Sequence, residues 1–160
     1  MPWPTDQTAF PRMRPLVSWI TDQVAIAGAG ITPETWPELQ QLGFDAVVNL
    51  RSEYQDSFGE PFPKAYLWIP TEDYIDPQPQ LLWLSAQFID GAVKSGYKVL
   101  VHCKMGIYRS ATTIVAYLIF TGLSEEEAIR KFAENGLRSY GSEENHKTLD
   151  AFVALLASKR

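Results

Sequence analysis

Short apolar runs alternate with amphipathic segments along most of the chain. Four of the runs have the length and composition of buried strands, at about residues 22–27, 46–50, 66–69 and 98–102. Five segments repeat apolar residues at helical spacing, at about residues 32–42, 81–95, 110–121, 124–135 and 142–157. Strands separated by helices and followed by a helical tail predict an α/β domain. Its central sheet would be mainly parallel, with about four to five strands, and flanked by helices.

Residues at the ends of the expected helices support these boundaries. Thr32 has the hydroxyl group of an N-cap residue and is followed by Pro33 at the first helical position. Ser124 and Glu127 have the spacing of a capping box. In the segment 81–95, the residues predicted to share one buried face are Leu81, Leu84 or Ser85, Phe88, Ile89 and Ala92.

The composition is that of one ordinary globular domain. The chain has 160 residues, of which 46% are apolar and 21% are charged. Residues 1–15 contain four prolines and are expected to form an irregular arm, ahead of a single domain over residues 16–160. The longest apolar run, 114–120, is too short to span a bilayer, and the N-terminus lacks the layout of a secretion signal. We therefore expect a soluble, cytoplasmic protein.

Charge and cysteine content exclude several classes of function. The net charge of -5 and the pI near 5.0 argue against a nucleic-acid partner. The chain has one cysteine and so forms no intramolecular disulfide, which fits a reducing compartment. Its two histidines and one cysteine form no metal-ligand motif, so we expect no metal and no cofactor. The Gly-x-Gly at 28–30 lacks the rest of a nucleotide-binding motif and is interpreted as a turn.

The most informative segment surrounds the single cysteine. It reads His102-Cys103-Lys104-Met105-Gly106-Ile107-Tyr108-Arg109-Ser110. The preceding apolar run delivers Cys103 to a tight loop, and the loop opens a helix at about Ser110. Peptide N–H groups from Lys104 to Arg109 would converge beside the positive end of that helix, where they suit a phosphoryl group. Arg109 can form two hydrogen bonds to phosphate oxygens, and Ser110 can donate one to the sulfur.

A buried cysteine next to a surface arginine is the alternative interpretation of this segment. The histidine, glycine and arginine at these spacings, followed by serine or threonine, occur together by chance on the order of 1 in 80,000. The strand before the motif and the amphipathic helix after it also favour a nucleophilic thiol. His102 would point away from the site of Cys103, because neighbouring residues of a strand alternate sides, and would brace the loop.

The motif resembles the active-site loop of the cysteine-based protein tyrosine phosphatases, and within them the dual-specificity branch. The similar segments are Phe44–Arg51, Trp68–Asp73, Lys98–Cys103, Arg109–Thr112 and Ala116–Ile119, together with Gly106. The resemblance spans roughly residues 16–158, almost the whole chain. It implies a protein tyrosine phosphatase-like fold and the hydrolysis of phosphate monoesters through a phosphocysteine intermediate.

Hydrolysis by such a thiol has two further requirements. Cys103 must ionise at neutral pH, and a helix N-terminus with Arg109 beside the sulfur would lower its pKa from the usual value of about 8.5. The leaving oxygen also needs a proton. Three carboxyl groups lie upstream, those of Glu72, Asp73 and Asp76. The resemblance favours Asp73 as the general acid, with Asp76 and Glu72 as the alternatives.

The loop leaves the identity of the phosphate ester open. The short chain favours an open pocket for phosphotyrosine and for phosphoserine or phosphothreonine of proteins. Lys104 instead resembles the lysine of phosphatases that act on phosphatidylglycerophosphate, which makes a lipid, inositol or sugar phosphate the alternative substrate. A catalytically silent phosphate-binding module is the third possibility, although the chain has both Cys103 and Arg109.

The sequence also does not determine which residues around the motif recognise the substrate. Met105 and Tyr108 differ from the residues common in the family and would alter the depth of the pocket or its recognition. Arg51, Tyr54 or Arg138 could line the entrance. We expect a monomer whose partner is a phosphorylated protein or a small phosphate ester.

Overall fold

The strands and helices follow the α/β order expected from the sequence. The computed structural model describes residues 17–28, 30–52, 54–72, 75–103 and 108–160, so the predicted arm at 1–15 lies outside them. The strands are β1 (Val17–Trp19), β2 (Val24–Ala27), β3 (Phe44–Arg51), β4 (Ala65–Thr71) and β5 (Lys98–His102). The helices are α1 (Trp36–Gln41), α2 (Pro79–Lys94), α3 (Tyr108–Phe120), α4 (Glu125–Asn135) and α5 (Glu143–Ser158).

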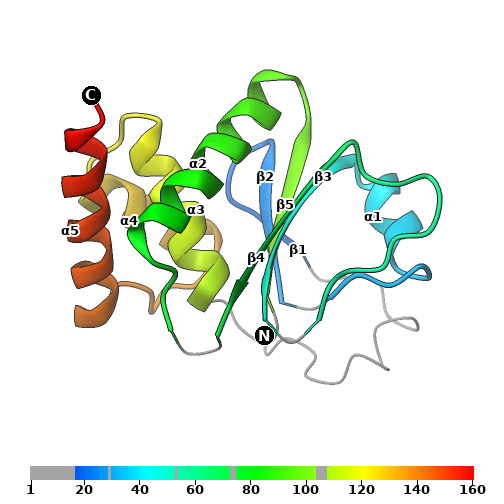
Figure 1. Ribbon diagram of the computed structural model, residues 1–160, viewed down its shortest axis with the longest axis horizontal. Helices are drawn as coiled ribbons and strands as arrows, with labels where there is room; N and C mark the ends of the chain where they lie inside the picture. The colour runs from blue at the N-terminus through cyan, green and yellow to red at the C-terminus, as the bar shows by residue number, and fades with distance from the viewer. Residues whose placement is uncertain (1–16, 29, 53, 73–74, 104–107) are drawn as a thin grey trace.

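One five-stranded sheet forms the centre of the molecule, in the order β1-β2-β5-β3-β4 (Figure 1). β5 lies between β2 and β3 and is parallel to both, and β3 is also parallel to β4. β1, which the sequence analysis did not predict, pairs with β2 in the antiparallel direction, and its three residues are too few to show a periodic pattern. The carboxyl ends of β2, β5, β3 and β4 therefore meet at the same edge of the sheet.

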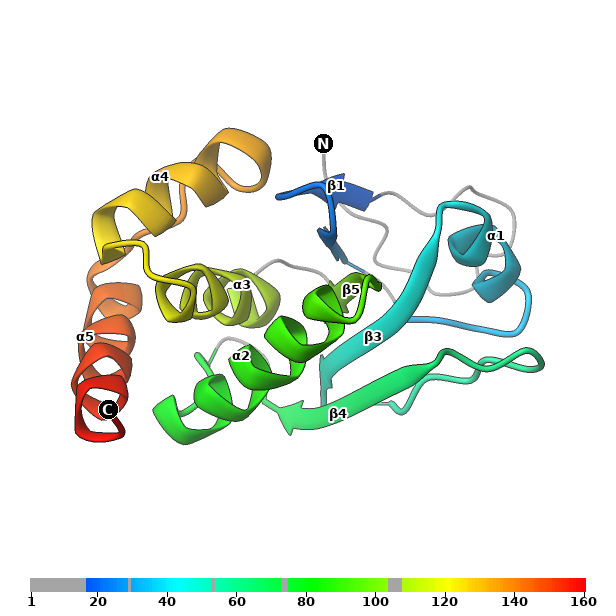
Figure 2. The same cartoon turned by 90° about the horizontal axis from the view of Figure 1, so that it is seen from above.

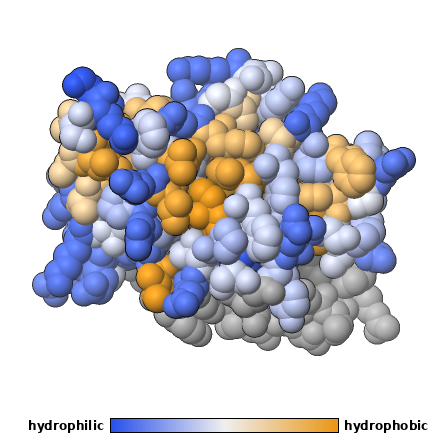
Figure 3. All heavy atoms as spheres, viewed as in Figure 1, coloured by the Kyte–Doolittle hydropathy of each residue, from blue (hydrophilic) through white to orange (hydrophobic). Residues whose placement is uncertain are grey.

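The helices cover the two faces of the sheet unequally (Figure 2). α1 lies on one face, and α2, α3, α4 and α5 lie on the other. α3 packs against α2, α4 and α5, so it forms the centre of the larger helical layer. Figure 3 shows that apolar side chains gather in the middle of the face drawn, over α2 and β4. No helix of the described part is long and apolar enough to cross a membrane.

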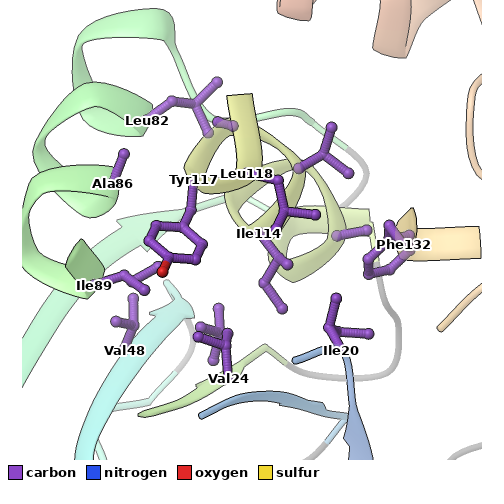
Figure 4. Packing of buried hydrophobic residues seen from close by; sticks show 14 of the residues in the cluster. Ile20, Val24, Val48, Leu82, Ala86, Ile89, Ile114, Tyr117, Leu118 and Phe132 are labelled. Carbon is purple, nitrogen blue, oxygen red and sulfur yellow. The ribbon is translucent and has the colours of Figure 1, made fainter. Parts of the chain in front are cut away.

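Alternate residues of the inner strands face the two helical layers. On β5, Val99 and Val101 belong to the core cluster beneath α2–α5, whereas Leu100 belongs to the cluster beneath α1. Val24 of β2 and Val48 of β3 lie on the side of the sheet that faces α3 (Figure 4). The inner strands are thus buried on both faces, which explains why they appear in the sequence as continuous apolar runs.

One expected helix start is wrong. α1 begins at Trp36, with Thr35 at its N-cap position, and not directly after Thr32. The carbonyl of Thr32 instead accepts hydrogen bonds from the N–H groups of Thr35 and Trp36, at 3.1 and 2.9 Å. Thr32 therefore begins a turn that precedes the helix, because its local hydrogen bonds compete with those of a helical N-cap.

Capping boxes confirm the predicted starts of the last two helices. At α4, Ser124 Oγ accepts a hydrogen bond from the N–H of Glu127 at 3.1 Å, and Glu127 Oε1 accepts one from the N–H of Ser124 at 3.2 Å. At α5, Ser142 is the N-cap residue and forms the equivalent box with Asn145. Each box satisfies N–H groups that a helix leaves without a partner in its first turn.

α2 buries a slightly different face from the one predicted. Of the two residues left open at that face, Ser85 is buried and Leu84 is 49% exposed. Leu82, which the predicted face did not include, is completely buried and lies beside α3 (Figure 4). The helix therefore turns Leu82 and Ile89 toward the core.

Leu82 and Leu84 provide a matched pair for testing this orientation of α2. We expect Leu82→Ala to lower the free energy of unfolding by ~2–5 kcal/mol, because it leaves a cavity between α2 and α3. Leu84→Ala removes the same atoms from an exposed position and should change the free energy by less than about 0.5 kcal/mol. Urea titrations followed by circular dichroism measure both values. Equal losses for the two variants would contradict the observed orientation.

Candidate active site

Cys103 lies at the carboxyl end of the central strand. It follows His102, the last residue of β5, and is 1% exposed. It belongs to the core cluster beneath α2–α5, in step with Val99 and Val101 on the same strand. Binding sites of open α/β sheets form outside the carboxyl ends of their strands. The expected nucleophile therefore lies at the edge of the sheet where such sites form.

The helix after the cysteine begins two residues earlier than expected. α3 starts at Tyr108, so Arg109 and Ser110 both belong to its first turn. The N-terminus of α3, which carries a partial positive charge, thus follows Cys103 after only four residues. Those four, Lys104, Met105, Gly106 and Ile107, lie outside the described residues, as does the side chain of Tyr108. Their predicted nest of N–H groups stays a prediction.

Arg109 is buried and joins the ends of two strands to α3. It is 1% exposed. Its Nη1 donates a hydrogen bond to the carbonyl of Thr71 at 2.5 Å and lies 3.5 Å from the carbonyl of Leu50. Thr71 ends β4, and Leu50 lies next to the last residue of β3. Because a buried guanidinium requires acceptors, these contacts draw the ends of β3 and β4 to the first turn of α3.

The segment that carries the candidate general acids is attached to α3 and α5. Asp76 Oδ1 accepts a hydrogen bond from Thr112 Oγ1 at 2.7 Å. Asn145 Nδ2 donates to both oxygens of the same carboxyl group, at 3.3 and 3.1 Å. These bonds give Asp76 a structural role and argue against it as the proton donor. Glu72 is exposed, and Asp73 lies outside the described residues.

The partners of Asp76 are themselves held in place. Thr112 Oγ1 lies 2.9 Å from the hydroxyl of Tyr140. Burial raises the pKa of Tyr140 well above its usual value, so the phenol keeps its proton at neutral pH. Asn145 Oδ1 accepts hydrogen bonds from N–H groups just before α5. Asp76 is therefore bound to side chains that cannot easily move.

Both ends of the segment from Thr71 to Asp76 are thus fixed to the start of α3. Thr71 is held by Arg109, and Asp76 is held by Thr112 three residues later on the same helix. This arrangement holds Thr71 and Asp76 at the beginning of α3. The acid-bearing segment was predictable from the sequence, but none of the contacts that hold it was.

His102 is buried against an aspartate that the sequence analysis missed. His102 Nε2 lies 2.6 Å from Asp56 Oδ2, and both side chains are completely inaccessible to solvent. Asp56 belongs to the connection between β3 and β4, 46 residues before His102. No local pattern marks Asp56, because its environment is created only when the ends of β3 and β5 come together.

Asp56 has two further partners. Its Oδ1 accepts a hydrogen bond from the N–H of Ile31 at 3.1 Å and lies 3.6 Å from Arg51 Nη2. Arg51 is 2% exposed and so does not line an entrance, which the sequence had left open. Tyr54, by contrast, is exposed, and its ring centre lies 5.3 Å from the guanidinium carbon of Arg51. Arg138 is exposed as well.

Gly30 is required by the position of Arg51. A Cβ atom at position 30 would lie 2.3–2.4 Å from three guanidinium atoms of Arg51. Any side chain there would therefore displace the arginine from beside Asp56. The second glycine of the Gly-x-Gly, interpreted as a turn residue from the sequence, has this packing role in addition.

Two other expectations concern Ser110 and metals. Ser110 is buried, and its Oγ has no hydrogen-bond partner among the described residues, so its predicted bond to the sulfur of Cys103 stays a prediction. Within the described part of the chain, no three His, Cys, Asp or Glu side chains are grouped so that they could hold a metal ion.

Comparison with known proteins identifies similar sequences. The family model described as "Dual specificity phosphatase, catalytic domain" matches residues 31–148. Dual specificity protein phosphatase 2 of Mus musculus is 41% identical over 87 residues, which cover 51% of this chain and 25% of that protein. Phosphatidylglycerophosphate phosphatase PTPMT1 of Arabidopsis thaliana is 32% identical over 106 residues, which cover 61% of this chain and 32% of that protein. The chain thus spans about a third or less of the length of these two relatives.

The fold is also similar to solved structures. The crystal structure of Tk-PTP in the active form superposes with a TM-score of 0.70 and 28% sequence identity, over 88% of this chain and 97% of that one. This similarity confirms the α/β fold class that the sequence predicted.

Proposed function

The chain belongs to the dual-specificity phosphatase catalytic domain family, and we propose that it hydrolyses phosphate monoesters through a phosphocysteine intermediate on Cys103. The observation that carries this proposal is the position of Cys103 at the end of β5, with Arg109 six residues later in the first turn of α3. Phosphotyrosine and phosphoserine or phosphothreonine side chains of proteins are the proposed substrates.

The reaction would proceed in two displacements. The thiolate of Cys103 attacks phosphorus, an S–P bond forms, and the bond from phosphorus to the leaving oxygen breaks while a general acid protonates that oxygen. Water then attacks phosphorus, the S–P bond breaks, and the former acid accepts a proton from the water. Inorganic phosphate and the thiolate are the products. Arg109 and the N–H groups of residues 104–109 would stabilise the equatorial oxygens in both steps.

The environment of Cys103 supports its role as the nucleophile. The sulfur is buried, and burial alone would disfavour the thiolate. The N-terminus of α3 and the guanidinium of Arg109 would act in the opposite direction, because positive charge near the sulfur favours the thiolate, and we expect them to lower the pKa of Cys103 below that of an ordinary thiol. No metal ion is required for this chemistry, because these groups carry the positive charge that the phosphoryl oxygens need.

Asp73 remains the proposed general acid. Asp76 already binds Thr112 and Asn145 and is therefore the weakest of the three candidates. Glu72 is exposed, directly after the residue whose carbonyl binds Arg109. Asp73 follows Glu72 in the sequence, between the two residues that are held to α3, and the resemblance of this segment to the acid loop of the family favours it.

A lipid or other small phosphate ester is the second candidate substrate. The observation in its favour is the similarity to a phosphatidylglycerophosphate phosphatase, over a longer part of this chain than the similarity to the mouse protein phosphatase. Lys104, directly after the nucleophile, points to the same class, because a lysine there adds positive charge for an anionic head group. The two classes differ in what surrounds the phosphate and not in the reaction.

Hydrolysis of p-nitrophenyl phosphate in the presence of a chelator tests the proposed activity. We expect metal-independent turnover by the wild type and a loss of at least ~10³-fold in Cys103→Ser, because the hydroxyl is a far weaker nucleophile at neutral pH. The same preparations assayed with phosphopeptides and with dispersed phosphatidylglycerophosphate then compare the two substrate classes by kcat/KM. Phosphate binding without any turnover would instead support the silent binding module.

Substitution of the three carboxyl groups tests the choice of general acid. Asp73→Asn should lower kcat by ~10²–10⁴-fold for phenyl phosphate and by less for esters with better leaving groups, since only a poor leaving group depends strongly on protonation. Asp76→Asn removes a structural contact, so we expect it to lower kcat by a smaller factor, which should be similar for all leaving groups. If Glu72→Gln shows the leaving-group dependence and Asp73→Asn does not, Glu72 is the acid.

A further inference from the structure

A buried polar cluster lies behind the nucleophile and has no part in the chemistry described so far. It consists of Arg51, Asp56 and His102, and it is packed against Gly30. Its members come from the carboxyl ends of β3 and β5 and from the connection between β3 and β4. Its side chains are 0–2% exposed, so the cluster is closed to solvent and to substrate.

The cluster lies on the side of β5 opposite to Cys103. Leu100 faces the α1 layer, and Val101 and Cys103 face the α2–α5 layer. His102 follows the alternation of Leu100, and its partner Asp56 also binds the N–H of Ile31, a residue of the α1-side core. His102 is therefore the residue through which this cluster reaches the backbone that carries the nucleophile.

The contact with Asp56 defines the protonation of one nitrogen of His102. A carboxylate can only accept, so the 2.6 Å contact places a proton on Nε2. His102 Nδ1 is buried and has no hydrogen-bond partner among the described residues. The bond to Asp56 is thus the one described contact that fixes the orientation of the imidazole ring.

Stability of the fold is a weak reason for such a cluster. Removing charged groups from water offsets most of their mutual attraction, so a buried ion pair commonly adds little to stability compared with well-packed apolar residues. What the polar cluster does provide is a fixed direction for one side chain, because hydrogen bonds are directional and apolar contacts are not. That side chain belongs to His102, whose backbone is joined to Cys103 by a peptide bond.

We propose that Asp56 is a positioning residue for the nucleophile, acting through His102. By holding the imidazole, Asp56 fixes the backbone at His102 and Cys103, and hence the direction of the sulfur relative to α3 and Arg109. Orienting partners of this kind commonly contribute about 10- to 100-fold to the activity of the group that they hold. The proposal deepens the proposed function and rests on Cys103 as its nucleophile.

Asp56→Asn tests this role because it keeps the shape of the side chain. Ile31 N–H lies at Oδ1 and His102 Nε2 lies at Oδ2, and in the amide one of these two positions becomes an NH2 donor that can no longer accept. We expect the midpoint of the pH profile for alkylation by iodoacetamide to rise, because the sulfur loses its alignment with the donors that stabilise the thiolate. We also expect kcat/KM to fall by about 10- to 100-fold.

The direction of the shift separates positioning from a simple charge effect. Besides His102, Arg51 and Tyr66 are the charged and titratable residues of the described part whose contacts with Asp56 are observed, and the variant leaves both side chains unchanged. Loss of a nearby negative charge by itself favours a thiolate and would lower the midpoint. A lower or unchanged midpoint therefore overturns the proposal.

Two controls make the test specific. Asp45→Asn makes the same chemical change at the other end of β3, where the side chain is 31% exposed and paired with Lys64 at 3.6 Å, so its midpoint should equal that of the wild type. In a His102→Ala background, Asp56→Asn should produce no further rise of the midpoint, because residues that act in series are not additive. A further rise in that background would show that Asp56 acts independently of His102 and would overturn the proposal.

The experiment remains decisive if Asp56→Asn does not fold. In that case His102→Gln is compared with His102→Ala, because the glutamine amide N–H can reach Asp56 in place of Nε2. The alkylation midpoint of His102→Gln should be closer to that of the wild type than the midpoint of His102→Ala. Equal midpoints would contradict the proposal. Because Cys103 is the single cysteine of the chain, alkylation reports on it alone and needs no turnover. Failure of the proposed phosphatase activity would therefore be seen separately, as absence of hydrolysis by the wild type.

Discussion

A buried guanidinium must have hydrogen-bond acceptors, and this requirement on Arg109 determines how the sheet meets the helical layer. Its side chain cannot reach water, so backbone carbonyls at the ends of β3 and β4 serve as acceptors. Those carbonyls lie close together because β3 and β4 are parallel and end at the same edge of the sheet, where Arg51 is opposite Thr71. The first turn of α3 is therefore bound to the ends of β3 and β4. These contacts also restrict the position of Cys103, because Cys103 lies in the chain between β5 and α3.

Two polar networks then hold this junction from opposite sides of the sheet. On the α1 side, Asp56 binds His102 and lies beside Arg51. On the other side, Asp76 joins Thr112 of α3 to Asn145 of α5. Neither network contains Cys103 or Arg109, but the first includes His102, which directly precedes Cys103, and the second includes Thr112, three residues after Arg109. Rigid support of this kind is what a reactive thiol needs if its sulfur is to meet phosphorus along one direction.

The parts of the fold that were predictable are those encoded by neighbouring residues. The inner strands are buried on both faces and appear as apolar runs, and the starts of α4 and α5 are encoded by serine caps three residues before their partners. Cys103 and Arg109 are likewise six residues apart, so their spacing could be read directly. The start of α1 was wrong because Thr32 and Thr35 are both plausible caps, and only their mutual hydrogen bonds decide between a turn and a helix.

The supporting residues could not be found in the same way. Asp56 and His102 are 46 residues apart, and Asp76 and Asn145 are 69 residues apart, so no periodicity links them. The sequence allowed Arg51 to line the entrance, because an arginine at the end of a strand is usually exposed. In the structure it is buried, because Gly30 has no side chain and leaves room for the guanidinium. Asp76 was an alternative to Asp73 as the general acid in the sequence, and its structural role is shown only by the partners that α3 and α5 bring to it.

Trapping of the covalent intermediate is the measurement that tests the central claim most directly. Wild-type protein would be mixed with an excess of p-nitrophenyl phosphate, quenched in acid within the first turnovers, digested and analysed by mass spectrometry. The account predicts one phosphoryl group on the peptide that contains Cys103, present during turnover and absent once the substrate is exhausted. Hydrolysis without a phosphorylated cysteine, or with the phosphoryl group on another residue, would contradict it.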